Sequence, residues 1–459
     1  MGRYQWSLWT LCGFGWLADQ MLLQMLALIQ TQAQADLGYS TTKAGGITSC
    51  YFAGLAIGAS FWGIMSDVWG RKPAFLCTLS TAGLFAIFLG AQANYAGLCA
   101  MAALMGTGTG GNLPLDGAIF LEASPGNVQR MLMLLSVFWS IGQLIASLVA
   151  WGFIGYPVDQ SWRYTCYTLG CIVIFMFICR FLFPFEESPK NLLANGKPTQ
   201  AIANLNKIAK LNKRPERIEI GDLNLTENSL GSKSFSGTDV TTMDILRANF
   251  RDFDFQRVKS LFATKKMAAT TIIVWLLWIF IQVGYSSFNA FLPRYLQEKG
   301  VGAGKTIDET YLEYVIISVC GLPGSFLALV MVEIPYVGRK GTMAIGAAVG
   351  AASLALFAKL KSSGGQLAAA CIQSFIQNGL FYAVLYAYSP EVFPTAVRGT
   401  AVGLASMLAR VFAVWVPVST GALLEVSTDL PLIIAAVFFG LLVPLSLALP
   451  IETKGRQAL

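Results

Sequence analysis

Twelve apolar stretches, each close to the length of a membrane-spanning helix, alternate with polar segments along the chain. About 20 apolar residues cross the hydrocarbon core of a bilayer as a helix, and a helix satisfies its own backbone polar groups there. The pattern therefore predicts an all-α membrane protein with twelve transmembrane helices. The predicted spans are residues 6–30, 42–65, 73–92, 96–120, 131–154, 163–184, 268–292, 310–332, 342–358, 366–388, 399–423 and 429–449.

A long polar stretch divides the twelve predicted spans into two groups of six. We expect an N-terminal six-helix bundle in 1–185, a cytoplasmic linker in 186–267 and a C-terminal six-helix bundle in 268–459. Apolar residues at near-helical spacing among lysines predict short amphipathic helices in the linker, at the inner leaflet or the cytosolic face. These residues are Leu193, Ile202, Leu205, Ile208 and Leu211. The polar segment that follows them is typical of disorder.

Composition supports a membrane protein and limits the chemistry. Hydrophobic residues make up 55% of the chain and charged residues 12%, with a mean hydropathy of +0.58; soluble domains carry about 25% charged residues. The nine cysteines show no pairing framework and no zinc spacing, and there is no histidine. We therefore expect no metal site, no cofactor and no enzymatic activity. A proton-carrying step would have to use carboxylates, and the lack of a phosphate-binding loop disfavours an ATP-driven pump.

The distribution of basic residues predicts the orientation in the membrane. Most of the 32 Lys and Arg residues fall on one side if both termini are cytosolic, which is the positive-inside pattern. The net charge of +7 is then a topology signal, not an indication of nucleic-acid binding. We expect a multi-pass protein with both termini in the cytosol, in the plasma membrane rather than an internal membrane.

Two motifs recur at nearly the same offset in the two halves. Gly338-Arg339-Lys340 follows Gly70-Arg71-Lys72 by 268 residues. The pair Glu391 and Arg398 follows the pair Glu122 and Arg130 by 269 and 268 residues. A parallel repeat in a hydrophobic chain predicts a transporter built from two similar membrane bundles.

The segment from Gly63 to Lys72, with the spacing G-x-x-x-D-x-x-G-R-K, resembles the loop signature of the major facilitator superfamily. GFGWLADQ, GNLPLDGAIFLEASP and YSPEVFPTAVRGTAVGLASMLARV resemble the branch that holds the synaptic vesicle glycoproteins, with organic ion transporters as neighbours. Sugar porters share the Glu187-Ser188-Pro189 pattern. The resemblance covers nearly the whole chain and implies the two-bundle fold, alternating access and a monomer.

The repeated charged residues form a candidate cytosolic gate. A carboxylate at the end of one helix and a cationic turn can connect neighbouring helices in one conformation and separate in the other. The alternative is a set of exposed ion pairs at helix ends, each worth little. The gate candidates are Asp67, Gly70, Arg71, Lys72, Glu122, Arg130, Arg339, Glu391 and Arg398.

Three charges lie in the middle of predicted spans: Asp19, Asp116 and Arg410. Charges at this depth are costly, so they usually face a cavity and carry function. We predict that they form the coupling and substrate-binding core, with the two acids as proton carriers if transport is proton-coupled. A buried Asp–Arg pair that only locks the helices together is the alternative. We expect Arg180, near the inner end of its span, to extend to the interface.

Uncharged polar and aromatic residues complete the candidate site, namely Gln143, Tyr285, Asn378 and Tyr382. Arg410 suits a carboxylate because its guanidinium donates two parallel hydrogen bonds. We therefore expect a secondary active transporter of a small organic solute, preferably an organic anion, with proton symport as one hypothesis. A sugar or polyol facilitator and a transporter-like sensor without net flux are the alternatives. The expected partners are the solute, protons and the lipid bilayer.

Overall fold

The structure is a computed structural model that describes residues 2–123, 131–187, 189, 192, 198–214, 255–301, 306–393 and 398–452. For 67–68, 132–133, 198, 255–257, 299–301, 378 and 398–399 it describes the backbone alone. Every regular element within these ranges is a helix. The predicted disordered segment, Leu193 of the predicted amphipathic helices, Arg130 and the side chains of Asp67, Asn378 and Arg398 lie outside what is described.

The helices account for twelve membrane crossings, as predicted. Ten are long and apolar enough to span a bilayer on their own. The fourth and fifth crossings are interrupted at Gly111 and Leu135, so each consists of two shorter helices. The N-terminal crossings are α1 (Arg3–Leu37), α2 (Thr41–Val68), α3 (Arg71–Gly90), α4 (Tyr95–Gly110) with α5 (Asn112–Ala123), α6 (Met131–Leu134) with α7 (Ser136–Gly152), and α8 (Val158–Leu182).

The second six crossings follow the same plan, with one irregular helix. The tenth crossing contains a π-helical turn, η3, between two α-helical pieces. A short helix, α14 (Leu292–Val301), follows the first crossing of this half. The C-terminal crossings are α13 (Lys265–Asn289), α15 (Ile307–Glu333), α16 (Gly338–Lys359), α17 (Ser363–Ile376) with η3 (Gln377–Ala383) and α18 (Val384–Val392), α19 (Arg398–Val426), and α20 (Asp429–Ala448).

Polar side chains start several helices by accepting hydrogen bonds from backbone N–H groups that have no partner within the helix. Asn94 Oδ1 accepts from the Gly97 N–H at 2.7 Å. Thr306 and Glu309 form a reciprocal capping box at the start of α15. Gly38 ends α1 in the left-handed region, at φ 66°. Such caps allow short polar turns between long apolar helices.

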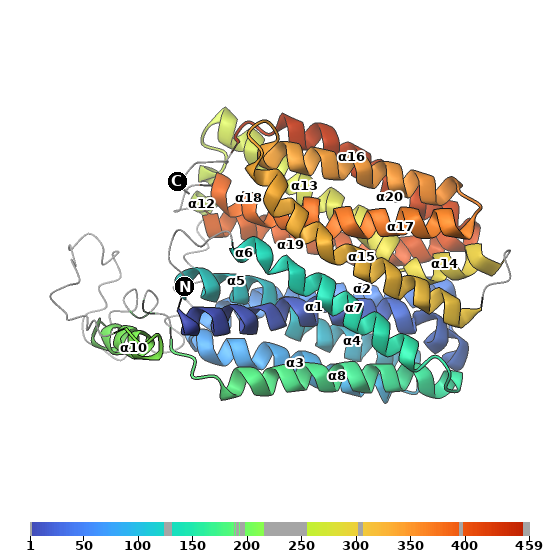
Figure 1. Cartoon of the computed structure of the whole chain (residues 1–459), viewed down its shortest axis with the longest axis horizontal. Coiled ribbons are helices and arrows are strands. Elements are labelled where there is room, and N and C mark those ends of the chain that lie inside the picture. The colour runs from blue at the N-terminus through green and yellow to red at the C-terminus, as the bar shows by residue number, and fades with distance from the viewer. Residues whose placement is uncertain are drawn as a thin grey trace.

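The two sets of six helices lie side by side as two bundles (Figure 1). They meet along two seams, one between α2 and α19 and the other between α7 and α15. We call the end that carries Gly2, Glu187 and Glu452 the terminal face and the other end the opposite face. The helix α10 (Pro198–Leu211), which lies in the segment predicted to be amphipathic, lies beside the terminal face. Asn212 follows this helix, and its Oδ1 atom accepts a hydrogen bond from the Tyr4 N–H at 2.9 Å. The domain limits at 185 and 268 remain a prediction.

Glycines bring α2 and α4 into backbone contact within the N-terminal half. A Cβ atom at Gly106 would lie 2.2 Å from the Tyr51 carbonyl oxygen, and one at Gly110 would lie 2.2 Å from the Leu55 carbonyl oxygen. Small residues let helices approach this closely in a bilayer, where packing rather than the hydrophobic effect holds helices together. The separation of α2 and α4 therefore depends on these two positions.

We predict that Gly106→Ala lowers the melting temperature of the detergent-purified protein by several degrees, because the new methyl group pushes α2 away. Gly440→Ala is the matched control, because Gly440 has nothing within 4 Å of its Cβ direction. The control should be neutral or slightly stabilising, since Ala favours a helix over Gly by about 1 kcal/mol. Tryptophan fluorescence on heating measures both variants. Equal melting temperatures for Gly106→Ala and the wild type would contradict the close contact between α2 and α4 at Gly106.

Candidate substrate cavity and gates

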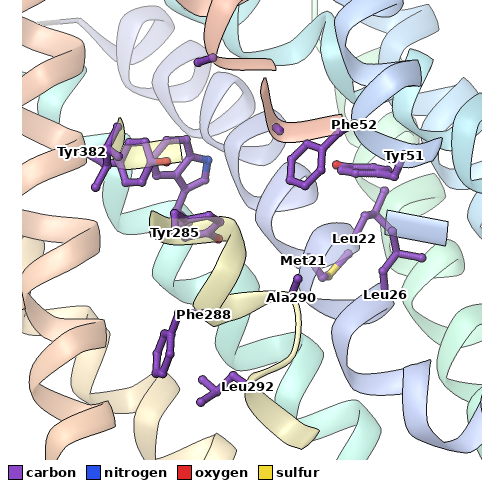
Figure 2. Close-up of a cluster of buried hydrophobic side chains, with 14 of the residues drawn as sticks. Met21, Leu22, Leu26, Tyr51, Phe52, Tyr285, Phe288, Ala290, Leu292 and Tyr382 are labelled. Atoms are coloured by element: carbon purple, nitrogen blue, oxygen red, sulfur yellow. The ribbon is translucent and has the colours of Figure 1, made fainter. Parts of the chain in front are cut away.

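A cavity of about 80 Å³ lies between the two halves. Its wall includes Asp19 of α1 and Arg410 of α19, which bring opposite charges from the two halves to one space. Tyr285 and Tyr382, both predicted as site residues, also line it. Figure 2 shows these two tyrosines on one side and Tyr51 on the other. The structure thus brings together four of the seven predicted substrate and coupling residues.

Asp19 is buried, with 6% of its surface exposed, and only one of its carboxylate oxygens has a hydrogen bond in the described structure. Oδ1 accepts from Asn112 Nδ2 at 3.0 Å, at the start of α5. Oδ2 has no hydrogen-bond partner among the described residues. A buried carboxylate with one unused oxygen beside a cavity can accept a proton or bind a donor group of a solute.

Arg410 is half-buried, and no hydrogen bond or ion pair to another described residue holds its guanidinium. The groups that act on it electrostatically are Tyr386, Asp19 and Tyr51. An arginine has five N–H donors and is always charged. A guanidinium in a membrane cavity that no described residue pairs with is suited to an anionic group from outside the protein.

Aromatic rings from both halves enclose the cavity toward the terminal face. Trp16 and Trp139 of the N-terminal half lie with ring centroids 5.0 Å apart, and Trp139 contacts Tyr386 at 5.4 Å. Trp278 stacks edge-on against Tyr386 at 4.6 Å, and its indole N–H donates to Ser389 Oγ at 2.9 Å. These rings close the cavity by contact rather than by ion pairs.

Hydrogen bonds between the halves close the cavity toward the opposite face. The Tyr285 hydroxyl and the Gln20 amide bond across the interface at 2.7 Å. One turn further along α1, the Tyr314 hydroxyl donates to Gln24 Oε1. Beyond these, the Tyr311 hydroxyl donates to the Leu28 carbonyl at 2.7 Å. The Ser147 and Ser318 hydroxyls meet at 2.8 Å on the α7–α15 seam. The structure is therefore closed toward the opposite face.

Asp116 does not line this cavity. It accepts two hydrogen bonds from Arg180 Nη2, at 3.0 and 2.9 Å, and neither side chain is exposed. Arg180 also donates to the Leu11 carbonyl at 3.0 Å and to the Phe75 carbonyl at 2.8 Å. Gly15 leaves room for the pair, because a Cβ there would lie 1.7 Å from Asp116 Oδ2. The expectation that Arg180 extends to the interface was wrong.

Gln143 lies buried in α7, but it is not among the cavity-lining residues. The side chain of Asn378 lies outside the described residues, although its backbone belongs to the π-helical turn. The sequence did not indicate that Gln20 and Trp278 line the cavity. It also did not indicate that Asn112 donates a hydrogen bond to Asp19. Asn112 had a usable signal, because it stands one helical turn before Asp116 inside a predicted span.

At the terminal face, each half holds the same charged cluster. Arg71 Nη2 pairs with Glu122 at 3.2 Å, and Glu187 accepts from the Arg71 backbone N–H at 3.0 Å. In the second half Arg339 Nη2 pairs with Glu391 at 2.6 Å, and Glu452 accepts from the Arg339 backbone N–H at 3.2 Å.

The turns that position these clusters also correspond. Glu187 and Glu452 accept from the N–H groups of Lys72 and Lys340 as well, at 3.4 and 3.2 Å. Gly70 and Gly338 adopt positive φ angles of 98° and 59°, which favour glycine. Each of these contacts joins helices of one half. The structure thus brings together Arg71 with Glu122 and Arg339 with Glu391, whereas the predicted pairings of Glu122 with Arg130 and of Glu391 with Arg398 lie outside the described side chains.

We predict that Asp116→Asn and Arg180→Met each lower the melting temperature sharply, because removal of one partner leaves a buried charge and costs about 3–5 kcal/mol. The double variant Asp116→Leu with Arg180→Met should recover much of the loss. Asp19→Asn, whose carboxylate has no ionic partner in the described structure, should melt close to the wild type. Thermal unfolding in one detergent compares all four. A loss for Asp19→Asn as large as that for Asp116→Asn would overturn this distinction.

A family model described as Major Facilitator Superfamily matches residues 10–335. The chain is 37% identical to an MFS siderochrome iron transporter 1 of Ceriporiopsis subvermispora, over all of this chain and 89% of that protein. It is 27% identical to a synaptic vesicle 2-related protein of Rattus norvegicus, over 99% of this chain and 80% of that protein. This agrees with the branch that the sequence motifs indicated.

Two further comparisons concern transporters with named solutes. The chain is 27% identical to a niacin transporter, NiaP, of Acinetobacter baylyi, over 91% of this chain and 87% of that protein. Its fold is similar to the partially occluded inward open structure of the xylose transporter XylE from E. coli, with a TM-score of 0.74, 18% identity and 99% of both chains covered. From the family match and the full-length similarity, this chain belongs to the major facilitator superfamily and is a multi-pass membrane transporter, not an enzyme.

Proposed function

We propose that the chain transports a small organic anion by alternating access, with Arg410 as the group that binds the anion. The observation that carries this proposal is the guanidinium of Arg410 in the cavity between the halves, without a hydrogen bond or ion pair to the described residues. A carboxylate can bind this guanidinium through two parallel hydrogen bonds. The cavity of about 80 Å³ is smaller than usual ligand pockets, so binding requires the aromatic rings to move.

The aromatic walls favour a flat solute. Trp139, Trp278 and Tyr386 line the same cavity as Arg410 and contact one another, and aromatic ligands pack well against such rings. The similar bacterial protein is named a niacin transporter, and niacin is a flat ring with one carboxylate.

Asp19 is our candidate for proton coupling. It shares the cavity with Arg410, and its Oδ2 atom has no hydrogen-bond partner among the described residues. A proton on Asp19 would neutralise the acid that competes with an incoming anion for Arg410, so proton and anion would bind together. Such mutual stabilisation is what symport requires. Asp116, in contrast, is already held by Arg180, and we assign it a structural role.

We propose that the terminal face is cytosolic, in the plasma membrane, and that a single chain suffices for transport. The two clusters around Arg71 and Arg339 would keep each half rigid near the cytosol. The hydrogen bonds that join Gln20 with Tyr285 and Gln24 with Tyr314 would break when the opposite face opens. Motion of two rigid bundles around a central site is the usual form of alternating access.

A sugar or polyol facilitator is the second candidate. Gln20, Gln282 and Tyr382 line the cavity, and the Tyr382 hydroxyl donates to Gln282 Oε1 at 3.1 Å. Amides and hydroxyls of this kind hydrogen-bond neutral hydroxyl groups, and the fold is similar to a xylose transporter. This candidate does not require the charge of Arg410.

We predict that Arg410→Gln abolishes uptake of a radiolabelled aromatic monocarboxylate into proteoliposomes. Arg410→Lys should raise KM about 10- to 100-fold, because the charge remains but the two parallel hydrogen bonds are lost. Val411→Ala, on the exposed side of the same helix, is the control and should transport normally. Uptake of xylitol or glucose that persists in Arg410→Gln would support the facilitator instead, and binding without counterflow would support a sensor.

We also predict that Asp19→Asn removes the response of uptake to an imposed proton gradient. Exchange of labelled for unlabelled solute across the membrane should persist, because the solute site remains and only the proton acceptor is lost. Proteoliposomes loaded at pH 7.5 and diluted into pH 6.0 or 7.5 buffer give the comparison. Uptake by Asp19→Asn that still rises with the proton gradient would contradict this assignment.

A further inference from the structure

A groove of about 970 Å³ runs between α16 and α20, away from the substrate cavity. The α16 wall of the groove consists of small side chains, including Ala351 and Ala355, which lie one helical turn apart. The α20 wall carries Ile433 and Val437, whose side chains are 49% and 55% exposed. In a chain that spans the bilayer, an exposed apolar wall of this kind faces lipid rather than water.

The mouth of the groove is charged and lies at the opposite face. Lys359 ends α16, Lys361 follows in the turn, and Asp429 begins α20. Two cations and one acid give the mouth a net charge of about +1. Both lysines are exposed. No ion pair or hydrogen bond joins either lysine side chain to another residue in the part of the chain that the structure describes.

The other cations of the opposite face whose side chains the structure describes make contacts within the protein. Arg163 pairs with Asp36 at 3.2 Å, and Arg294 pairs with Glu298 at 2.5 Å. Lys43 lies over the ring of Tyr95, 5.9 Å from its centroid. Basic residues are scarce on this side of the predicted topology. The mouth of the groove therefore holds two lysines and one aspartate, and neither lysine side chain bonds to a described residue, so an external anion can bind there.

The groove is charged at one end and apolar along the rest of its length, which matches the charged head group and apolar tail of an amphiphilic molecule. Charge stands at the helix ends, and apolar side chains continue toward the middle of the membrane. From Lys359 back to Ala351 the helix advances about 12 Å, which accommodates about half of a lipid acyl chain. A soluble anion would use the lysines but not the apolar walls.

We propose that this groove binds an anionic phospholipid, with its phosphate against Lys359 and Lys361 and one acyl chain between α16 and α20. The net charge of the mouth matches the single negative charge of a phosphodiester such as phosphatidylglycerol. A bound lipid fills space that the alanines leave open, so it stabilises the packing of α16 against α20. The proposal does not depend on which solute the chain carries.

The test is the melting temperature of the full chain in mixed micelles, with native mass spectrometry to count retained lipids. Phosphatidylglycerol should raise the melting temperature of the wild type by several degrees more than phosphatidylcholine does. Lys359→Gln with Lys361→Gln should reduce this difference to near zero. Ala355→Trp, which fills the groove, should do the same and lose the retained lipid.

Ala352→Trp and Lys43→Gln are the matched controls. Ala352 is exposed on α16 but does not line the groove, and Lys43 lies on the same face but in the other half. Both should keep the wild-type response. An unchanged response in the double lysine variant would overturn the proposal, as would an equal stabilisation by soluble glycerol phosphate. A dimer that Ala355→Trp dissociates would assign the groove to a second copy instead.

Discussion

The structure depends on one constraint, namely that a charge or polar group inside the bilayer needs a partner from the protein itself. Arg180 shows how the chain meets it. Its guanidinium donates to two backbone carbonyls and to both oxygens of Asp116, and Gly15 leaves the space for this arrangement. Replacing water around a buried ion is expensive, so this pair is stable only because the hydrogen bonds are complete.

The same constraint makes the exceptions informative. Arg410 and one oxygen of Asp19 are polar groups at membrane depth that the described part of the protein does not satisfy, and both belong to the same cavity. A membrane protein retains such groups only where water or a solute reaches them. Arg180 is thus an arginine whose guanidinium is fully hydrogen-bonded within the bundle, whereas Arg410 is the one that we propose binds the solute.

The contacts within the halves and those between them differ in kind. Within each half, an arginine, a helix-end glutamate and a second glutamate that accepts backbone N–H groups form a charged cluster. Between the halves, the hydrogen bonds on the opposite-face side of the cavity join neutral hydroxyls and amides, such as Tyr285 with Gln20. A neutral hydrogen bond contributes only about 1 kcal/mol net. The contacts between the halves are thus weaker than the charged clusters within each half, and the alternating access that we propose would break them first.

The amino-acid sequence by itself determined the twelve spans, the amphipathic helix α10 and the repeated motifs, because hydrophobic length and helical spacing are local properties. It also predicted Asp19, Arg410, Tyr285 and Tyr382 as members of one substrate and coupling site. Only the tertiary structure decided the partners. Asp116 and Arg180 are 64 residues apart in sequence but share one buried pair, so the depth of Arg180 in its span could not reveal that partner. Which charges pair with each other in the described structure depends on how helices from distant parts of the chain pack, and no local sequence pattern records that.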